Sequence, residues 1–121
     1  MISAEELESS LSHFTGTSQY FRDPLTKLIY TEGIRHLVEQ AGANWLLTDI
    51  GAVFRYSPKV RDMGFQLWTL VVNPDATALL TCKEDCDMPV LYEQKYGYTD
   101  FPVGTWKMYL YNDVLMVPSE Y

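Results

Sequence analysis

The sequence predicts an α+β fold in which N-terminal helices pack on one face of an antiparallel sheet of about five strands. Three observations lead to this prediction. Apolar residues recur at helical spacing in residues 1–62, they alternate with a period of two in residues 65–118, and the predicted strands are joined by short connections. Connections of this kind favour a meander, with each strand beside the next. The 121 residues fit a single domain, 1–121, and contain no evident linker.

The first predicted helix begins after Ser3, because Glu6 follows at the spacing of a capping box. Its apolar face would consist of Leu7, Leu11 and Phe14. Gly16 is expected to end it, since glycine interrupts helices at low steric cost. Residues 15–30 are too apolar for a free linker, so we expect a packed loop there with a short turn of helix or strand.

The second predicted helix covers residues 32–41, with Thr31 as its N-terminal cap and Gly42 as its C-terminal stop. Its apolar stripe has the helical spacing and consists of Ile34, Leu37, Val38 and Ala41. A third, more apolar helix is expected from Asn44 to about Phe54. Ser57 and Pro58 then predict a short helical turn at 58–62.

The predicted strands begin after Gly64, where the apolar period changes to two. Residues 65–72 are apolar on both faces and read as a central strand. The next strands are expected at 77–81 and 90–98, and the last two at 106–111 and 114–117. Turn residues separate them at Asn73-Pro74-Asp75 and at Asn112-Asp113.

The net charge of −7 argues against a nucleic-acid-binding protein. Phosphate backbones repel such a protein, so the sequence predicts no direct binding to nucleic acid and an attraction to basic protein surfaces instead. Apolar runs are too short to span a bilayer, and the N-terminus lacks the pattern of a signal peptide. We therefore expect a cytoplasmic protein, in a reducing setting that disfavours a structural disulfide.

Two cysteines, Cys82 and Cys86, lie in an acidic connection between predicted strands. A structural zinc ion needs four ligands, and the spacing offers only two soft ones. The alternatives are a redox pair and a hairpin tip whose thiols have no role. The last reading is preferred, and the sequence predicts neither a metal nor a cofactor.

Other polar residues have a structural and a functional reading. Asp49 in the apolar third helix is either a catalytic acid or, more commonly for a buried carboxylate, the partner of a cation or a tyrosine hydroxyl. His13 and His36 read as surface or capping residues rather than as general bases. A small basic cluster, Arg55, Lys59 and Arg61, reads as a solvated turn or as a phosphate site.

Five stretches of the chain have a recognisable pattern. They are FTGTSQYFRDPL (14–25), IYTEGIRHLVEQAGANWLL (29–47), FQLWTLVVN (65–73), YTDFP (98–102) and VLMVPSEY (114–121). Together they resemble a small bacterial domain-of-unknown-function family carried on phages, plasmids and other mobile elements. Glu32 stands where the family pattern has aspartate, and Asn44 where it has tyrosine. The resemblance implies a mobile-element setting and assigns no activity and no catalytic residues.

The first functional hypothesis is a non-enzymatic acidic protein that binds and inhibits a host defence effector. It would act as anti-CRISPR proteins do, blocking a basic nucleic-acid-binding surface of a Cas protein or complex in the manner of a DNA mimic. Aromatic residues would anchor the contact, and carboxylates would steer it and compete with phosphates. The predicted partner-binding residues are Glu84, Asp85, Asp87, Glu93, Tyr96, Tyr98 and Asp100.

Two alternatives remain open at this stage. The protein could be an accessory factor of a mobile element that acts through protein contact, or a small enzyme that uses Asp49 or a histidine. A deep pocket lined by converging polar groups would favour the enzyme. Self-association is compatible with each hypothesis.

Overall fold

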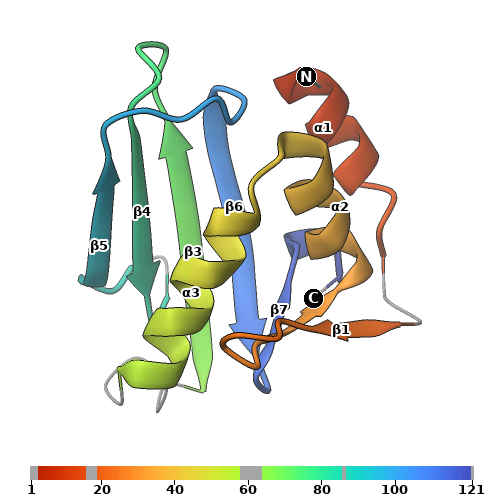
Figure 1. Cartoon of the computed structure of the whole chain (residues 1–121), viewed down its shortest axis with the longest axis vertical. Coiled ribbons are helices and arrows are strands. Elements are labelled where there is room, and N and C mark those ends of the chain that lie inside the picture. Colours follow the sequence, from red (N-terminus) through yellow and green to blue (C-terminus); the bar gives the residue numbers. More distant parts are fainter. Residues whose placement is uncertain (1–2, 16–18, 58–63, 86, 121) are drawn as a thin grey trace.

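The computed structural model describes residues 3–15, 19–57, 64–85 and 87–120 of the chain. These residues form an α+β fold of three α-helices, a seven-stranded mixed sheet and one short 3₁₀ helix (Figure 1). The elements in chain order are α1 (Ala4–Leu11), β1 (Tyr20–Arg22), β2 (Ile29–Thr31), α2 (Glu32–Ala41), α3 (Asn44–Tyr56), β3 (Phe65–Val72), β4 (Ala78–Lys83), β5 (Val90–Tyr96), β6 (Gly104–Tyr111), β7 (Val114–Met116) and η1 (Pro118–Glu120).

The sheet differs from the predicted meander in its order, which is β1-β2-β7-β6-β3-β4-β5. The five predicted strands correspond to β3 through β7, but β6 does not pair with β5. The connection at 97–103 instead crosses the end of the sheet and places β6 antiparallel to β3 (Figure 1). Strands β6, β3, β4 and β5 thus form a Greek key. This order joins the two eight-residue apolar strands β3 and β6 along their full length at the centre of the sheet.

Two further strands lie in the segment that the sequence left as a packed loop. Strands β1 and β2 form an antiparallel hairpin, and β2 pairs with β7 in parallel. The prediction of an all-antiparallel sheet is therefore wrong at this edge. The hairpin turn is closed by Asp23, whose Oδ2 accepts hydrogen bonds from the Thr26 amide at 2.9 Å and the Thr26 hydroxyl at 2.6 Å.

The first helix has the predicted start and an earlier end. The Ser3 hydroxyl accepts a hydrogen bond from the Glu6 amide at 3.2 Å, which confirms the cap. The helix ends at Leu11, and the amides of His13 and Phe14 continue as a turn by donating to Ser10 and Leu11. Gly16, the predicted stop, lies outside the described residues.

The second helix has the predicted bounds. The Thr31 hydroxyl accepts from the Ile34 amide at 3.3 Å, and Gly42 adopts a left-handed φ of 61°. A residue with a side chain would be strained there, which explains the glycine. Its predicted apolar stripe is buried throughout, at Ile34, Leu37, Val38 and Ala41.

The third helix runs two residues further than predicted, to Tyr56. Its buried face consists of Leu46, Leu47, Ile50 and Gly51. Asp49 is half-buried on the neighbouring side. The predicted turn at 58–62, with the basic residues Lys59 and Arg61, lies outside the described residues.

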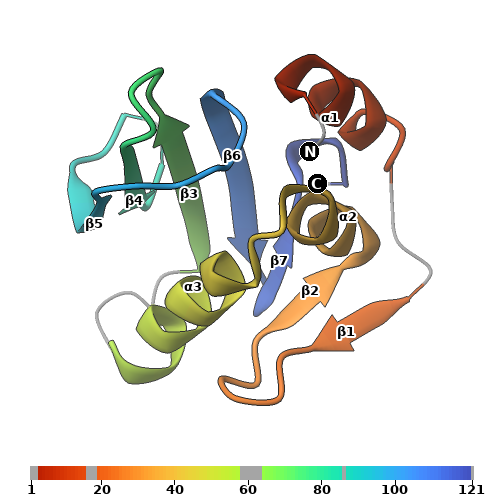
Figure 2. The same cartoon turned by 45° about the horizontal axis from the view of Figure 1, so that its top comes forward.

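The two faces of the sheet have different surroundings. Helices α2 and α3 lie on one face, and α1 packs beside α2 (Figures 1 and 2). Alternate side chains of the central strands point into this helix-covered core, among them Trp68, Leu70, Leu80, Met108 and Leu110. The opposite face, here called the open face, carries the alternate set, including Phe65, Thr69, Lys107 and Tyr109.

Candidate functional site

The predicted partner-binding residues do not form one surface. Glu84, Asp85 and Asp87 lie in the connection between β4 and β5, and all three are exposed. Tyr96, Tyr98 and Asp100 lie at the other end of β5 and just beyond it. The seven residues of edge strand β5 separate the two groups by roughly 20 Å. The predicted partner-binding residues therefore fall at two separate places, one at each end of edge strand β5.

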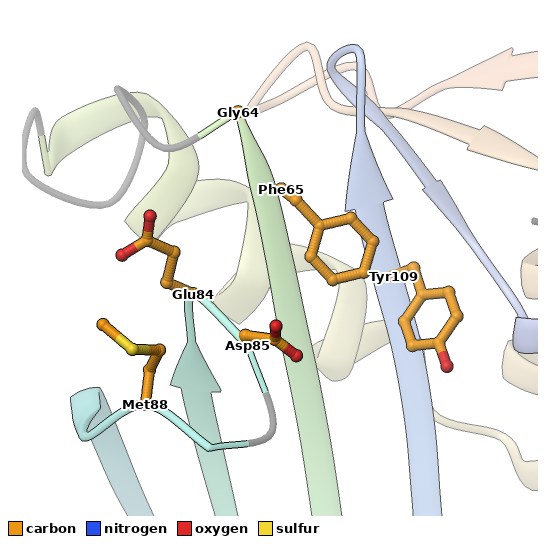
Figure 3. Close-up of a pocket in the computed structure, with 6 residues that line it drawn as sticks. All are labelled: Gly64, Phe65, Glu84, Asp85, Met88 and Tyr109. Carbon is orange, nitrogen blue, oxygen red and sulfur yellow. The ribbon is translucent and has the colours of Figure 1, made fainter.

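The first place is a hollow on the open face, here called the tip hollow (Figure 3). It measures about 720 Å³ and is lined by Gly64, Phe65, Glu84, Asp85, Met88 and Tyr109. The start of β3 and the facing part of β6 supply the aromatic side, and the β4–β5 connection supplies the acidic side. Figure 3 shows Asp85 pointing toward the rings of Phe65 and Tyr109 and Glu84 pointing the other way.

Strand pairing holds the aromatic side of the tip hollow in place. The ring centroids of Phe65 and Tyr109 are 5.2 Å apart, and those of Phe65 and Tyr111 are 6.4 Å apart. Pairing of β3 with β6 sets Phe65 opposite Tyr111, so all three rings project from the same face. Tyr111 remains 43% exposed and extends the aromatic surface toward the end of β6.

The rest of the open face is not acidic. Across the strands, one row of paired residues runs from Lys107 on β6 through Thr69 and Thr81 to Glu93 on β5. In the neighbouring row on the same face, Leu79 pairs with Lys95. Lys83 projects from the same face beside Leu67. On the open face, acidic and aromatic residues thus meet at the tip hollow, while Glu93 lies among lysines and threonines.

The second place, here called the crossing hollow, lies between α3 and the connection that crosses from β5 to β6. It measures about 310 Å³ and is lined by Trp45, Asp49, Tyr96, Tyr98, Thr99 and Asp100. The rings of Trp45 and Tyr96 pack with centroids 4.8 Å apart. Tyr98 is 77% exposed and forms an outer wall.

Asp49 accepts a hydrogen bond from the Tyr96 hydroxyl at 2.5 Å, so this carboxylate has a tyrosine as its structural partner, one of the pairings predicted for it. Burial and this hydrogen bond raise the pKa of Tyr96 well above its usual range, because both favour the neutral phenol. Burial and the same carboxylate also raise the pKa of Tyr92. The Asp49 carboxylate therefore acts on two phenols, on Tyr96 through a hydrogen bond and on Tyr92 through its charge.

The cysteine prediction is corrected in one respect. Cys82 belongs to β4 and points into the helix-covered core, where it is fully buried as a free thiol. Its Sγ lies 3.9 Å from Oε1 of Gln66, and burial raises the pKa of the thiol to about 12. Cys82 is thus a core residue and not part of a hairpin tip, and Cys86 lies outside the described residues. Within the described ranges, no group of three His, Cys, Asp or Glu side chains could hold a metal ion.

The histidines lie apart from both hollows. His36 is half-buried between the first two helices, with its Nε2 2.8 Å from the Ser10 hydroxyl and its ring 5.2 Å from that of Phe14. It joins α1 to α2 and is not the plain surface residue that was expected. His13 follows the end of α1 and is exposed, as predicted.

Sequence reasoning did not assign six of the residues that line the hollows to a site. They are Gly64, Phe65, Met88 and Tyr109 at the tip hollow, and Trp45 and Thr99 at the crossing hollow. Alternation along β3 and β6 could have placed Phe65 and Tyr109 on one face, but only if the pairing of these strands had been known.

None of the helices in the described part of the chain has the length and apolar character needed to cross a membrane.

Comparison with known proteins identifies a family for this chain. No curated protein and no solved structure matches the chain. A family of unknown function, DUF6876, matches residues 5–121. Because this match covers nearly the whole sequence, the chain belongs to DUF6876.

Proposed function

We propose that this protein is a non-enzymatic binding protein that docks through its tip hollow onto a basic surface of another protein. The observation that carries the proposal is the arrangement at this hollow. Exposed carboxylates of Glu84 and Asp85 stand on the rim of a concavity whose other side is the ring pair of Phe65 and Tyr109. Asp87 adds a third exposed carboxylate in the same connection.

Aromatic residues in a concavity are typical anchors of protein interfaces, because they bury much area at little cost in side-chain entropy. Charged groups on the rim mainly raise the rate of association and select the partner. A net charge of −7 adds long-range attraction toward a basic partner. This combination requires neither a cofactor nor a deep polar pocket.

The proposed partner is a host defence effector whose basic surface normally holds nucleic acid, a CRISPR effector being the first to test. Carboxylates at the tip would occupy positions that phosphates otherwise take. The choice of effector follows from the resemblance to proteins of mobile elements, whose success depends on escaping host defence. The interaction would take place in the host cytosol.

The test combines binding with a functional readout. The purified protein is titrated against a panel of purified CRISPR effector complexes, and interference against a phage or plasmid is measured with and without it. We expect binding to one effector that weakens as salt is raised, together with loss of interference. Absence of both binding and inhibition across the panel would overturn the CRISPR-directed proposal.

A matched pair of variants tests the location of the interface. The first carries Glu84→Gln, Asp85→Asn and Asp87→Asn at the tip. The control removes three exposed charges elsewhere, through Glu5→Gln, Glu8→Gln and Asp113→Asn. Both have the same net charge, so a general electrostatic effect would weaken them equally. We expect the tip variant to lose at least about tenfold more affinity for the effector than the control variant does, a difference of about 1.4 kcal/mol in binding free energy. Equal loss would contradict docking at the tip.

A further inference from the structure

The crossing hollow has the composition of a site for an organic cation. Trp45, Tyr96 and Tyr98 supply aromatic surface, and Asp49 and Asp100 supply negative charge. Aromatic faces attract cations through their quadrupole, and a nearby carboxylate adds direct attraction. Both features are assembled from elements that meet only in the folded chain, since α3 supplies Trp45 and Asp49 while β5 and the connection after it supply the rest.

The charges around the hollow have the sign that a cation needs. Within the described residues, the hydrogen-bond partner of the Asp49 carboxylate is the neutral Tyr96 hydroxyl, and no described cation forms an ion pair with Asp49. That hydrogen bond engages Oδ2 of the carboxylate. Asp100 is exposed at the mouth, where a charge meets an approaching ligand first.

The walls of the hollow are held by the fold and do not depend on a ligand. Thr99 is buried, its amide donates to the Ala76 carbonyl at 2.8 Å, and its hydroxyl accepts from the Phe101 amide at 3.1 Å. Trp45 is packed between the rings of Tyr96 and Phe101, whose centroids lie 4.8 and 6.5 Å from its own. A pre-formed site of this kind reduces the entropy lost on binding.

We infer that the crossing hollow binds the guanidinium group of an arginine side chain presented by the protein partner. A volume of about 310 Å³ is at the lower end of the range for small-molecule sites, which fits one side chain. Guanidinium suits the hollow better than ammonium, because its plane stacks on a ring while its five donors reach more than one carboxylate. This inference deepens the proposed function, since it supplies a second contact on the same edge of the sheet.

The two contacts could engage one partner that wraps around edge strand β5, because the tip hollow lies on the open face and the crossing hollow lies beside α3 on the helix-covered face. They lie at opposite ends of edge strand β5, roughly 20 Å apart. The tip hollow would then receive the partner's apolar and basic residues at one end, while the crossing hollow holds an arginine at the other. Two linked contacts on a rigid sheet bind more tightly than either alone.

The first experiment tests the hollow without any partner. The isotopically labelled full chain is titrated with N-acetyl-arginine methylamide and followed by NMR, with the citrulline analogue as an uncharged control and the lysine analogue as a second cation. We expect saturable shifts at the indole NH of Trp45 and the amides of Tyr98 and Thr99, with a dissociation constant on the order of 1 mM, which corresponds to about 4 kcal/mol. The citrulline analogue should give none. Equal shifts from citrulline, or shifts elsewhere only, would overturn the inference, and a stronger response to lysine would refute the preference for guanidinium.

The variants Tyr98→Ala and Asp100→Asn alter exposed side chains, so the fold should tolerate both. Each should weaken arginine binding about two- to fivefold, the range of exposed cation–π and ion-pair contacts. Asp113→Asn removes an equal charge in the β6–β7 turn and should leave binding unchanged. Equal effects of Asp100→Asn and Asp113→Asn would contradict the site.

The same variants separate this inference from the proposed function. If an effector binds and only the tip variant weakens the complex, the proposed function stands and the arginine contact fails. If the arginine probe saturates the crossing hollow but no effector binds, the hollow stands and the choice of effector fails. Weakening of the complex by both the tip variant and Tyr98→Ala would support both proposals.

Discussion

Glu120, in the short helix η1, provides a quantitative test of how a single side chain stabilises the fold. Its carboxylate accepts three hydrogen bonds: from the Thr31 hydroxyl at 2.6 Å, the Val117 amide at 3.1 Å and the Gly33 amide at 3.3 Å. Thr31 and Gly33 are at the start of α2, where the helix dipole also favours negative charge. One side chain therefore joins η1 to the first turn of α2.

The expected loss on Glu120→Ala follows from these contacts. Hydrogen bonds to charged groups contribute about 1.5–3 kcal/mol each, and ordinary ones about 1 kcal/mol. Because Glu120 is half-buried, water would replace part of each bond, so the lower figure applies and three bonds give about 3 kcal/mol. Glu120→Gln keeps an acceptor but loses the charge, and should cost about 1–2 kcal/mol.

The assay is urea unfolding followed by circular dichroism, with thermal unfolding beside it. A loss of 3 kcal/mol corresponds to a fall in Tm of roughly 10 °C for a domain of this size. Ser119→Ala is the matched control, because it removes one exposed bond, from the Ser119 hydroxyl to the Leu11 carbonyl at 3.1 Å, and should cost under about 1 kcal/mol. The reasoning is refuted if Glu120→Ala and Ser119→Ala lower stability equally, or if Glu120→Gln is as harmful as Glu120→Ala.

Three further predictions concern the core and the crossing hollow. Gly51→Ala should lower the free energy of unfolding by about 1–3 kcal/mol, because an added Cβ would lie 2.7 Å from Cβ of Thr26, whereas Gly97→Ala, with open space around it, should change little in the same urea assay. Stability should fall above pH 9, by up to about 1.4 kcal/mol per pH unit, because the raised pKa of Cys82 makes the folded state retain a proton that the unfolded state releases. In urea unfolding between pH 8 and 11, Cys82→Ala should lose less stability with rising pH than the unaltered protein, and the raised pKa of Tyr96 should add to the fall above pH 10. The same dependence of stability on pH in both proteins would contradict the role of Cys82. Asp49→Asn and Tyr96→Phe should each cost about 1 kcal/mol, and a double-mutant cycle should give a combined loss smaller than the sum.

The helices were predictable because their signals are local. Ser3, Thr31 and Gly42 act as caps where the sequence placed them, since capping depends on residues three or four positions away. The hairpin turn at Asn112-Asp113 was predictable for the same reason, with both residues at positive φ as such turns require. The end of α1 was missed because Ser12 caps the helix four residues before the glycine that seemed the natural stop.

The sheet order was not predictable from local signals. Strands β3 to β7 could be predicted from the alternation of apolar and polar residues, but this alternation does not determine which strand pairs with which. The three-residue strands β1 and β2 are too short to show a period, and they form because β7 offers an edge for pairing. Glu120, at the other end of the chain, reinforces this pairing by accepting from Thr31 at the end of β2.

The candidate site follows from the sheet order, which explains why only its acidic half was foreseen. The carboxylates of the β4–β5 connection could be predicted because they are neighbours in the sequence, whatever the fold. The aromatic half depends on β6 returning beside β3, which sets Phe65 next to Tyr109 across 44 residues of sequence.

The crossing hollow depends on the same return of the chain. Only because the connection from β5 to β6 passes over the end of the sheet do Tyr98 and Asp100 come to lie beside Trp45 and Asp49 of α3. A true meander would place β6 beside β5 and away from β3, and would form neither hollow. Both proposed contacts are thus consequences of one topological step, and variants that loosen the pairing of β3 with β6 should impair both, whereas Tyr98→Ala and the tip variant should each impair one.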